Sequence, residues 1–236
     1  MGSFKSQLKK IGITKENIEM GITVSQCPIE YVTEDFLECF VNHLTIIGDS
    51  REQNDWIEKA CKYYHIAFEK AVKDKKAGTE NLKEGDYTFQ VQYGDTKFDY
   101  RGVVAYERKG SLSEIYNNLK SGDRDRIERE FERFIEKRYK KVVVVLEFGK
   151  NLSDLLDARF NFVDHWGMYQ EKNVNKLVYS SLMSWKQQNA FNFDIYQETD
   201  HSKIFWWIIT DMYYYFRNDI KNKIREQEMI ENGKND

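Results

Sequence analysis

GDYTFQVQYGDTKFDYRGVVAYERK, residues 85–109, alternates apolar or aromatic side chains with polar ones on both sides of Gly94-Asp95. Such alternation predicts β-strands, and a Gly-Asp pair between two alternating runs is typical of a hairpin turn. The sequence therefore predicts two paired strands, residues 86–93 and 97–107.

Acidic residues lie on both predicted strands, Asp86 on the first and Glu107 at the end of the second. Because side chains alternate between the two faces of a sheet, Lys109 points to the same side as Glu107, and Arg108 to the other. Acids on the strands of a core sheet need a reason, since carboxylates are mostly exposed to water. Two acids that hold a divalent cation, with a lysine beside them, are the layout of a metal-dependent phosphodiesterase.

Strands and helices alternate along the rest of the chain. Short apolar runs predict further strands at residues 44–47, 66–72, 140–148 and 192–196. Apolar residues at helical spacing predict helices over residues 55–65, 112–119, 127–134, 174–191 and 201–221. This order predicts the α/β class, with a sheet flanked by helices.

A third acid, Asp49, follows the strand at residues 44–47, in the run Gly48-Asp49-Ser50-Arg51-Glu52. Taken singly, each of these acids is more often part of a surface turn or an ion pair than of a metal site. Their common position at predicted strands is what makes them candidates for one site.

The chain of 236 residues is long enough for one main domain, and its single proline and the absence of a Gly/Ser-rich linker agree with that. We expect a small helical N-terminal appendage over residues 1–41, a main domain over residues 42–220 and a solvated tail over residues 221–236. Thr14 and Thr33 are candidate N-caps of helices in the appendage.

The three cysteines, Cys27, Cys39 and Cys61, are odd in number and have no C-x-x-C spacing. We interpret them as reduced core thiols of a cytoplasmic protein, with neither a disulfide framework nor a zinc site. The longest apolar runs are too short to cross a bilayer, and no signal peptide is expected.

The net charge of −3 argues weakly against a protein that binds nucleic acid, but the average hides a basic segment. Between residues 120 and 141 a stripe at helical spacing holds four basic residues: Arg126, Arg129, Arg133 and Lys137. This stripe could contact DNA phosphates. A parallel acidic stripe, Glu128, Glu132 and Glu136, supports the alternative of a solvated helix with internal ion pairs equally well.

Three short motifs in order carry a resemblance: residues 46–52 (IIGDSRE), Gly85-Asp86-Tyr87 and Glu107-Arg108-Lys109. Together they resemble the XPF-type nuclease domain, which has a restriction-endonuclease-like fold and cuts branched or flapped DNA. The resemblance covers roughly residues 42–217. It implies a mixed central sheet flanked by helices.

The resemblance also implies roles for residues of this sequence. Metal ligands would be Asp49, Asp86 and Glu107, for Mg²⁺ or Mn²⁺, and Lys109 would be the catalytic lysine. The remaining motif positions, which support the site, match Arg51, Glu52 and Arg108.

The sequence departs from the family pattern in two places. The family has an aspartate three residues after Glu-Arg-Lys, where this chain has Ser113, with Glu114 next to it. Either Glu114 is a substitute acid, or Ser113 caps a helix and catalysis is weaker or absent. Helix-hairpin-helix modules, common after the nuclease domain in the family, are not expected, so this chain resembles a compact phage or bacterial form.

The expected function is therefore a metal-dependent DNA endonuclease that hydrolyses phosphodiester bonds at branched, flapped or junction DNA. The resemblance implies a homodimer, and too many aromatic residues surround the helix at residues 204–216 for one inner face. No nucleotide cofactor and no membrane association is expected. The alternatives are an inactive nuclease-fold protein that binds DNA or serves as a scaffold, and a Holliday junction resolvase-like nuclease of the same fold.

Overall fold

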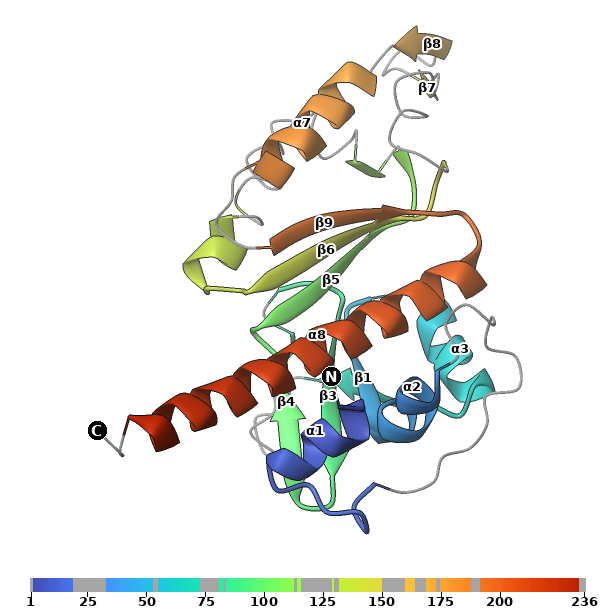
Figure 1. Ribbon diagram of the computed structural model, residues 1–236. Coiled ribbons are helices and arrows are strands. Elements are labelled where there is room, and N and C mark those ends of the chain that lie inside the picture. Colours follow the sequence, from blue (N-terminus) through green and yellow to red (C-terminus); the bar gives the residue numbers. More distant parts are fainter. Residues whose placement is uncertain are drawn as a thin grey trace.

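The computed structural model describes residues 2–18, 33–52, 55–72, 81–82, 84–112, 114–115, 129, 132–149, 160–163, 169–172, 175–187 and 192–233. A mixed sheet of seven strands forms the centre of the chain (Figure 1). In spatial order its strands are β2 (Ala67–Ala71), β1 (Leu44–Asp49), β3 (Tyr87–Tyr93), β5 (Val104–Lys109), β6 (Lys141–Leu146) and β9 (Asn192–Gln197), with β4 (Thr96–Asp99) paired to β3. The mixed α/β sheet flanked by helices that the sequence predicted is confirmed.

Strand direction changes twice across the sheet. β1 is parallel to β2 and antiparallel to β3, and β3 is antiparallel to β5. β5, β6 and β9 then run parallel to one another. The all-valine centre of β6, which is completely buried, is typical of a strand covered on both faces.

The predicted second strand of the hairpin, residues 97–107, is divided in two. After β4 the chain turns at residues 101–103, where Gly102 has a φ of 72°, and only then enters β5. The Tyr100 carbonyl accepts hydrogen bonds from the amides of Val103 and Val104, which closes this turn. Both β4 and β5 still pair with β3, so Asp86 and Glu107 remain on neighbouring strands, as expected.

Helices lie close to their predicted positions. The described helices include α1 (Phe4–Lys10), α2 (Glu34–Cys39), α3 (Trp56–Tyr63), α7 (Asn175–Gln187) and α8 (His201–Asn232), with a 3₁₀ turn η2 (Val41–His43). A small hairpin of β7 (Phe160–Val163) and β8 (Tyr169–Lys172) was not predicted. α8 continues eleven residues beyond the expected end at Lys221, and residues 225–233 are exposed.

Of the two predicted helix N-caps, Thr14 and Thr33, only Thr33 is confirmed. Thr33 caps α2, because its hydroxyl accepts a hydrogen bond from the Phe36 amide. Thr14 instead opens a turn, in which its carbonyl accepts from the Asn17 amide. The first helix, α1, is capped by Ser3.

One face of the sheet packs against α8, the long helix that crosses it in Figure 1. Alternate residues of β3, β5 and β6, such as Tyr87, Tyr106 and Val145, point to this side. α1 and α2 close the same core: Phe4 of α1 makes edge-to-face contacts with Tyr213 and Phe216 of α8, and Phe36 of α2 makes one with Tyr213. The boundary predicted at residue 41 stays a prediction.

The opposite face of the sheet has a second, smaller core. It contains Ala105 of β5, Val142, Val144 and Leu146 of β6, and Val178 and Leu182 of α7, with Ile115 and Phe134. Helices were predicted over residues 112–119 and 127–134. One described apolar residue from each, Ile115 and Phe134, packs in this second core.

Most aromatic residues of α8 are used within the chain. Trp206 is fully buried, and Trp207 stacks on Tyr196 with ring centroids 4.0 Å apart. Tyr214 alone of the aromatic residues in the described α8 is exposed by half or more. Their number is therefore accounted for by internal packing, and the homodimer stays a prediction.

Cys39 and Cys61 are free thiols in the core. Burial, together with the nearby charge of Glu58, raises the pKa of Cys61 to about 12, so this thiol stays protonated and unreactive at neutral pH. Cys27 lies outside the described residues. Within the part of the chain that the structure describes, none of the helices is both long and apolar enough to cross a membrane.

Candidate functional site

Three of the predicted acids lie side by side across the sheet. Gly48, Tyr87 and Tyr106 are direct partners on β1, β3 and β5. Continuing this register by one residue places Asp49 opposite Asp86, and Asp86 opposite Glu107. Two backbone hydrogen bonds fix the row: the Asp49 amide donates to the Asp86 carbonyl at 2.8 Å, and the Asp86 amide donates to the Tyr106 carbonyl at 2.9 Å.

The row faces away from α8. On β5, Ala105 belongs to the second core, so Glu107 and Lys109 extend along the same face. Lys109 Nζ donates to Glu107 Oε1 at 2.6 Å, and both side chains are nearly buried. Arg108 binds a different set of acids on the opposite face, as the two-residue period predicts.

Gly85 is required by the backbone that leads into this row. Its φ is 79°, and a Cβ added here would stand 2.8 Å from the Cβ of Ala105. Both the left-handed conformation and the close approach of β5 exclude other residues.

We therefore expect Gly85→Ala to lower the free energy of unfolding by about 1–3 kcal/mol, since it combines a strained backbone with a clash. It should also reduce any activity of the site, because the next residue is Asp86. Urea denaturation would measure the first effect. Gly12→Ala is the matched control, with a similar φ of 86° but nothing within 4 Å of the added Cβ. Equal losses in the two variants would show that the contact with Ala105 is unimportant.

Asp49 is held by its own loop. Its carboxylate accepts from the Arg51 amide at 2.7 Å and from Arg51 Nε and Nη2, each at 2.8 Å. The side-chain hydrogen bonds to Asp49 raise the pKa of the Arg51 guanidinium. Arg51 also donates to the carbonyl of Leu82, which ties this loop to the chain just before Gly85.

The donors of the row suit a hard cation, although they do not form a closed cage. Among the described residues, no three acids, histidines or cysteines lie close enough together to hold one metal ion. Asp86 and Glu107 nevertheless offer carboxylate oxygens from neighbouring strands, and Mg²⁺ commonly binds through one or two carboxylates, with water and substrate phosphates completing its shell. The donor chemistry of this pair therefore fits Mg²⁺ or Mn²⁺. Asp49, which is paired with Arg51, lies at the β1 end of the row.

Arg108 is buried behind the row and contacts three acids, Asp86, Glu147 and Glu52. Its backbone amide donates to Asp86 Oδ2 at 2.7 Å. Its guanidinium forms a two-point ion pair with Glu147 and reaches Glu52 Oε1 at 3.1 Å. Burial alone would lower the pKa of Arg108, but the hydrogen bonds and charge of Glu147 outweigh it and raise that pKa.

Glu147 was missed by the sequence analysis, which treated residues 140–148 as a strand only. The available signal was an acid directly after a run of buried valines, on a strand parallel to the one that carries Glu107 and Lys109. The register pairs Leu146 with Lys109, which places Glu147 beside the end of β5.

Glu114 lies next to Lys109. Its Oε1 is 4.0 Å from Lys109 Nζ, and its Oε2 accepts from the Gly110 amide at 2.9 Å. The capping hydroxyl of this helix belongs to Ser111, which accepts from the Glu114 amide. Ser113 itself lies outside the described residues.

Comparison with known proteins finds structural neighbours only. The chain is similar to two structures, XPF from Aeropyrum pernix and XPF from Aeropyrum pernix in complex with DNA. The two comparisons give 14% and 13% identity and TM-scores of 0.44 and 0.45. Each covers 72% of this chain and 65% of the other, so the match spans less than two thirds of those proteins. No family model and no curated protein matches.

The basic stripe is only partly described, since Arg126 lies outside the described residues. Arg129 is exposed. Arg133 Nε donates to Glu84 Oε2 at 2.8 Å, and Lys137 binds the other oxygen of this buried carboxylate. Two members of the stripe thus have an internal partner, just before Gly85, while their own side chains remain more than a third exposed. Their binding to DNA stays a prediction.

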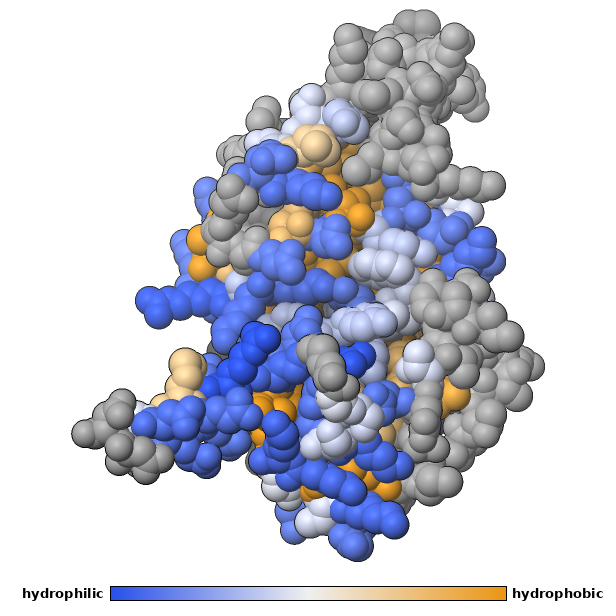
Figure 2. Space-filling model, in the orientation of Figure 1, coloured by the Kyte–Doolittle hydropathy of each residue, from blue (hydrophilic) through white to orange (hydrophobic). Residues whose placement is uncertain are grey.

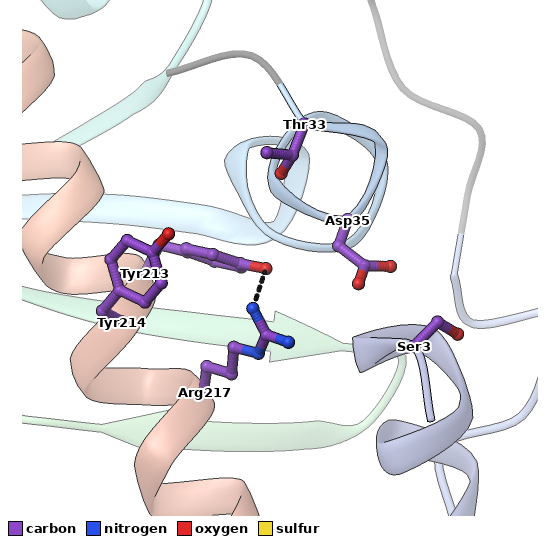
Figure 3. A pocket seen from close by; sticks show the side chains of 6 residues that line it. All are labelled: Ser3, Thr33, Asp35, Tyr213, Tyr214 and Arg217. Carbon is purple, nitrogen blue, oxygen red and sulfur yellow. Dashed lines mark hydrogen bonds between the residues drawn. The ribbon is translucent and has the colours of Figure 1, made fainter. Parts of the chain in front are cut away.

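A hollow of about 290 Å³ lies elsewhere, between α8 and the starts of α1 and α2 (Figure 3). It is lined by Ser3, Thr33, Asp35, Tyr213, Tyr214 and Arg217. Arg217 Nη1 reaches the Tyr213 hydroxyl at 3.5 Å, and its buried Nε has no partner among the described residues. All six residues lie outside the row of acids. Beyond this hollow, the last turns of α8 project from the body as a largely hydrophilic arm (Figure 2).

Proposed function

We propose that this protein is a divalent-metal-dependent endonuclease that hydrolyses phosphodiester bonds of branched, flapped or junction DNA. The observation that carries the proposal is the in-register row Asp49, Asp86 and Glu107 across three adjacent strands, with Lys109 on the same face. Four sequence-predicted residues from three separate motifs meet there. Three acids at one level of a core sheet are unusual, since carboxylates are mostly exposed to water.

In this proposal Asp86 and Glu107 bind Mg²⁺ or Mn²⁺, and Asp49 adds charge and outer-shell contacts. The cation, when bound, would stabilise negative charge on the phosphodiester and lower the pKa of a water nucleophile. Lys109, held at 2.6 Å by Glu107, would neutralise charge that develops on the phosphate. Glu114 would orient Lys109 from its other side.

Arg51, Glu52 and Arg108 are supporting residues in this scheme. Arg51 fixes the Asp49 carboxylate, and Arg108 holds Asp86 through its amide and Glu52 through its side chain. Binding of DNA phosphates is assigned to the basic stripe, most directly to the exposed Arg129. A homodimer would place two such sites on one DNA branch.

A second candidate is a catalytically inactive protein that binds DNA. The observation in its favour is that every acid of the row already has a donor from the chain: Arg51 on Asp49, the Arg108 amide on Asp86 and Lys109 on Glu107. If these contacts do not open, the row is a structural ion-pair network.

The deciding experiment is cleavage of end-labelled flap, fork, four-way junction and linear duplex DNA of matched length, with Mg²⁺, with Mn²⁺ and with EDTA. We expect metal-dependent cutting, with branched substrates preferred over the linear duplex. Binding of the same DNA in Ca²⁺, measured in parallel, separates the two candidates. Tight binding with no cutting under any metal condition would leave the inactive binder as the function.

A further inference from the structure

Glu147 contacts three side chains behind the candidate site. Its side chain is only 5% exposed. One carboxylate oxygen, Oε1, accepts from Arg108 Nε and from the indole N–H of Trp56, the latter at 2.9 Å. The other oxygen, Oε2, accepts from Arg108 Nη2 at 2.8 Å and lies 3.6 Å from His201 Nε2. Arg108 thus donates to both oxygens of the Glu147 carboxylate.

Each contact comes from a different part of the fold. Trp56 begins α3, His201 begins α8, and their rings stack at 4.5 Å with only 3° between the planes. Glu147 follows β6, and Arg108 lies on β5. A two-point ion pair between a planar guanidinium and a carboxylate fixes orientation as well as distance.

Glu147 is also hydrogen-bonded to β5 through its backbone, because its amide donates to the Lys109 carbonyl at 3.0 Å. It therefore restrains two successive residues, Arg108 by its side chain and Lys109 by its main chain. Gly110 leaves room for this packing. A Cβ there would lie 3.4 Å from Arg108 Nη2 and 3.8 Å from Glu147 Oε2.

Arg108 links Glu147 to the row of acids. Its amide holds Asp86 Oδ2 at 2.7 Å, and Nη1 reaches Glu52, which lies on the loop after Asp49. Since buried charges are stable only when they are paired, loss of the Glu147 charge would force this guanidinium to find water or another acid. Movement of Arg108 would then shift the amide on which Asp86 depends.

We propose that Glu147 is a positioning residue of the candidate site: through its ion pair with Arg108 and its hydrogen bond to Lys109 it sets the end of β5, and so the orientation of Asp86. The effect of Glu147 on cleavage rests on the proposed function, whereas its effect on the Arg108 amide does not.

Glu147→Gln tests this proposal. The amide keeps the size of the side chain but removes its charge and turns an NH₂ group toward the guanidinium. We expect kcat on DNA and the affinity for Mn²⁺, measured by calorimetry, each to fall about 10- to 100-fold, the range seen when outer-shell partners of metal ligands are removed. KM for DNA should stay unchanged, since Glu147 and its ion-pair partner Arg108 are both nearly buried and neither belongs to the basic stripe assigned to DNA binding. Hydrogen exchange of the Arg108 amide should become faster.

Asp211→Asn is the matched control, because it also neutralises a nearly buried acid that pairs with a lysine of the sheet. We expect this variant to be less stable yet to keep the wild-type kcat, Mn²⁺ affinity and Arg108 exchange rate per folded molecule. Trp56→Phe keeps a ring against His201 and removes only the indole donor to Glu147. Trp56→Phe should lower kcat and Mn²⁺ affinity and speed up Arg108 amide exchange, each by less than Glu147→Gln does. If Glu147→Gln does not fold, Trp56→Phe becomes the test of the positioning role.

The two possible failures are distinguishable. Wild-type protein that neither binds Mn²⁺ nor cuts DNA would overturn the proposed function, and the exchange rate of Arg108 would still test the positioning role. Active wild-type protein together with unchanged kcat, Mn²⁺ affinity and Arg108 exchange in Glu147→Gln, or in Trp56→Phe where only that variant folds, would overturn the positioning role alone.

Discussion

Asp86→Asn is expected to remove metal-dependent cleavage, with a loss of about 10³-fold or more. Asp86 is the middle member of the row, opposite Asp49 on one side and Glu107 on the other. Asparagine has the same shape and can still accept the hydrogen bond from the Arg108 amide, so the backbone should not move. What is lost is one negative charge at the position where the proposed cation would bind. A loss of about 4 kcal/mol in transition-state stabilisation corresponds to about 10³-fold in rate.

Single-turnover cleavage in Mg²⁺ and in Mn²⁺, with thermal unfolding of the same preparations, would measure this effect. Asp95→Asn is the matched control, because Asp95 is an exposed acid in the turn at the other end of β3. It should cut like the wild type. Lys109→Ala should also be inactive, but for a different reason, because it removes the positive charge beside Glu107. Full activity in a folded Asp86→Asn variant would remove Asp86 from the site.

The sequence predicted the row from two sources, the local alternation of side chains and the order of three motifs. Alternation along residues 85–109 set which side chains share a face, and the motif order placed Asp49, Asp86 and Glu107 at the ends of strands. The same local pattern could not show the break between β4 and β5. Residues 97–107 keep their apolar character through Tyr100 and Val103, and the turn is fixed to β3 by contacts distant in sequence: the Tyr100 amide donates to the Phe89 carbonyl, and the Thr88 hydroxyl donates to the Tyr100 carbonyl.

The supporting contacts could not be predicted for a different reason, which is distance along the chain. Glu147 is 39 residues from Arg108, and Glu84 is 49 residues from Arg133. An acid after a buried strand and an acid before Gly85 are unremarkable in sequence. Only the parallel pairing of β5 with β6 and the packing of residues 132–136 bring each of them to a basic partner.

Asp211→Ala is expected to lower the free energy of unfolding by about 3–5 kcal/mol, the range for removing one partner of a buried ion pair. Asp211 projects from α8 to the sheet, where one carboxylate oxygen binds Lys141 of β6 and the other accepts from the Tyr106 hydroxyl of β5 at 2.7 Å. Burial, with the charge of Asp211, raises the pKa of Tyr106, so this hydroxyl remains a donor at all pH values near neutrality. Alanine would leave both donors without a partner in the apolar layer between α8 and the sheet.

Urea denaturation at neutral pH would measure the loss, with Glu228→Ala as the control on the same helix. Glu228 pairs with Lys10 at 3.3 Å, but both side chains are more than half exposed, so this substitution should change stability by less than about 1 kcal/mol. The contrast tests how α8 is held, because apolar packing alone would make the two acids nearly equivalent. A loss below about 1 kcal/mol in Asp211→Ala would mean that the aromatic core fixes α8 without this polar contact, and that Lys141 and Tyr106 find water when Asp211 is gone.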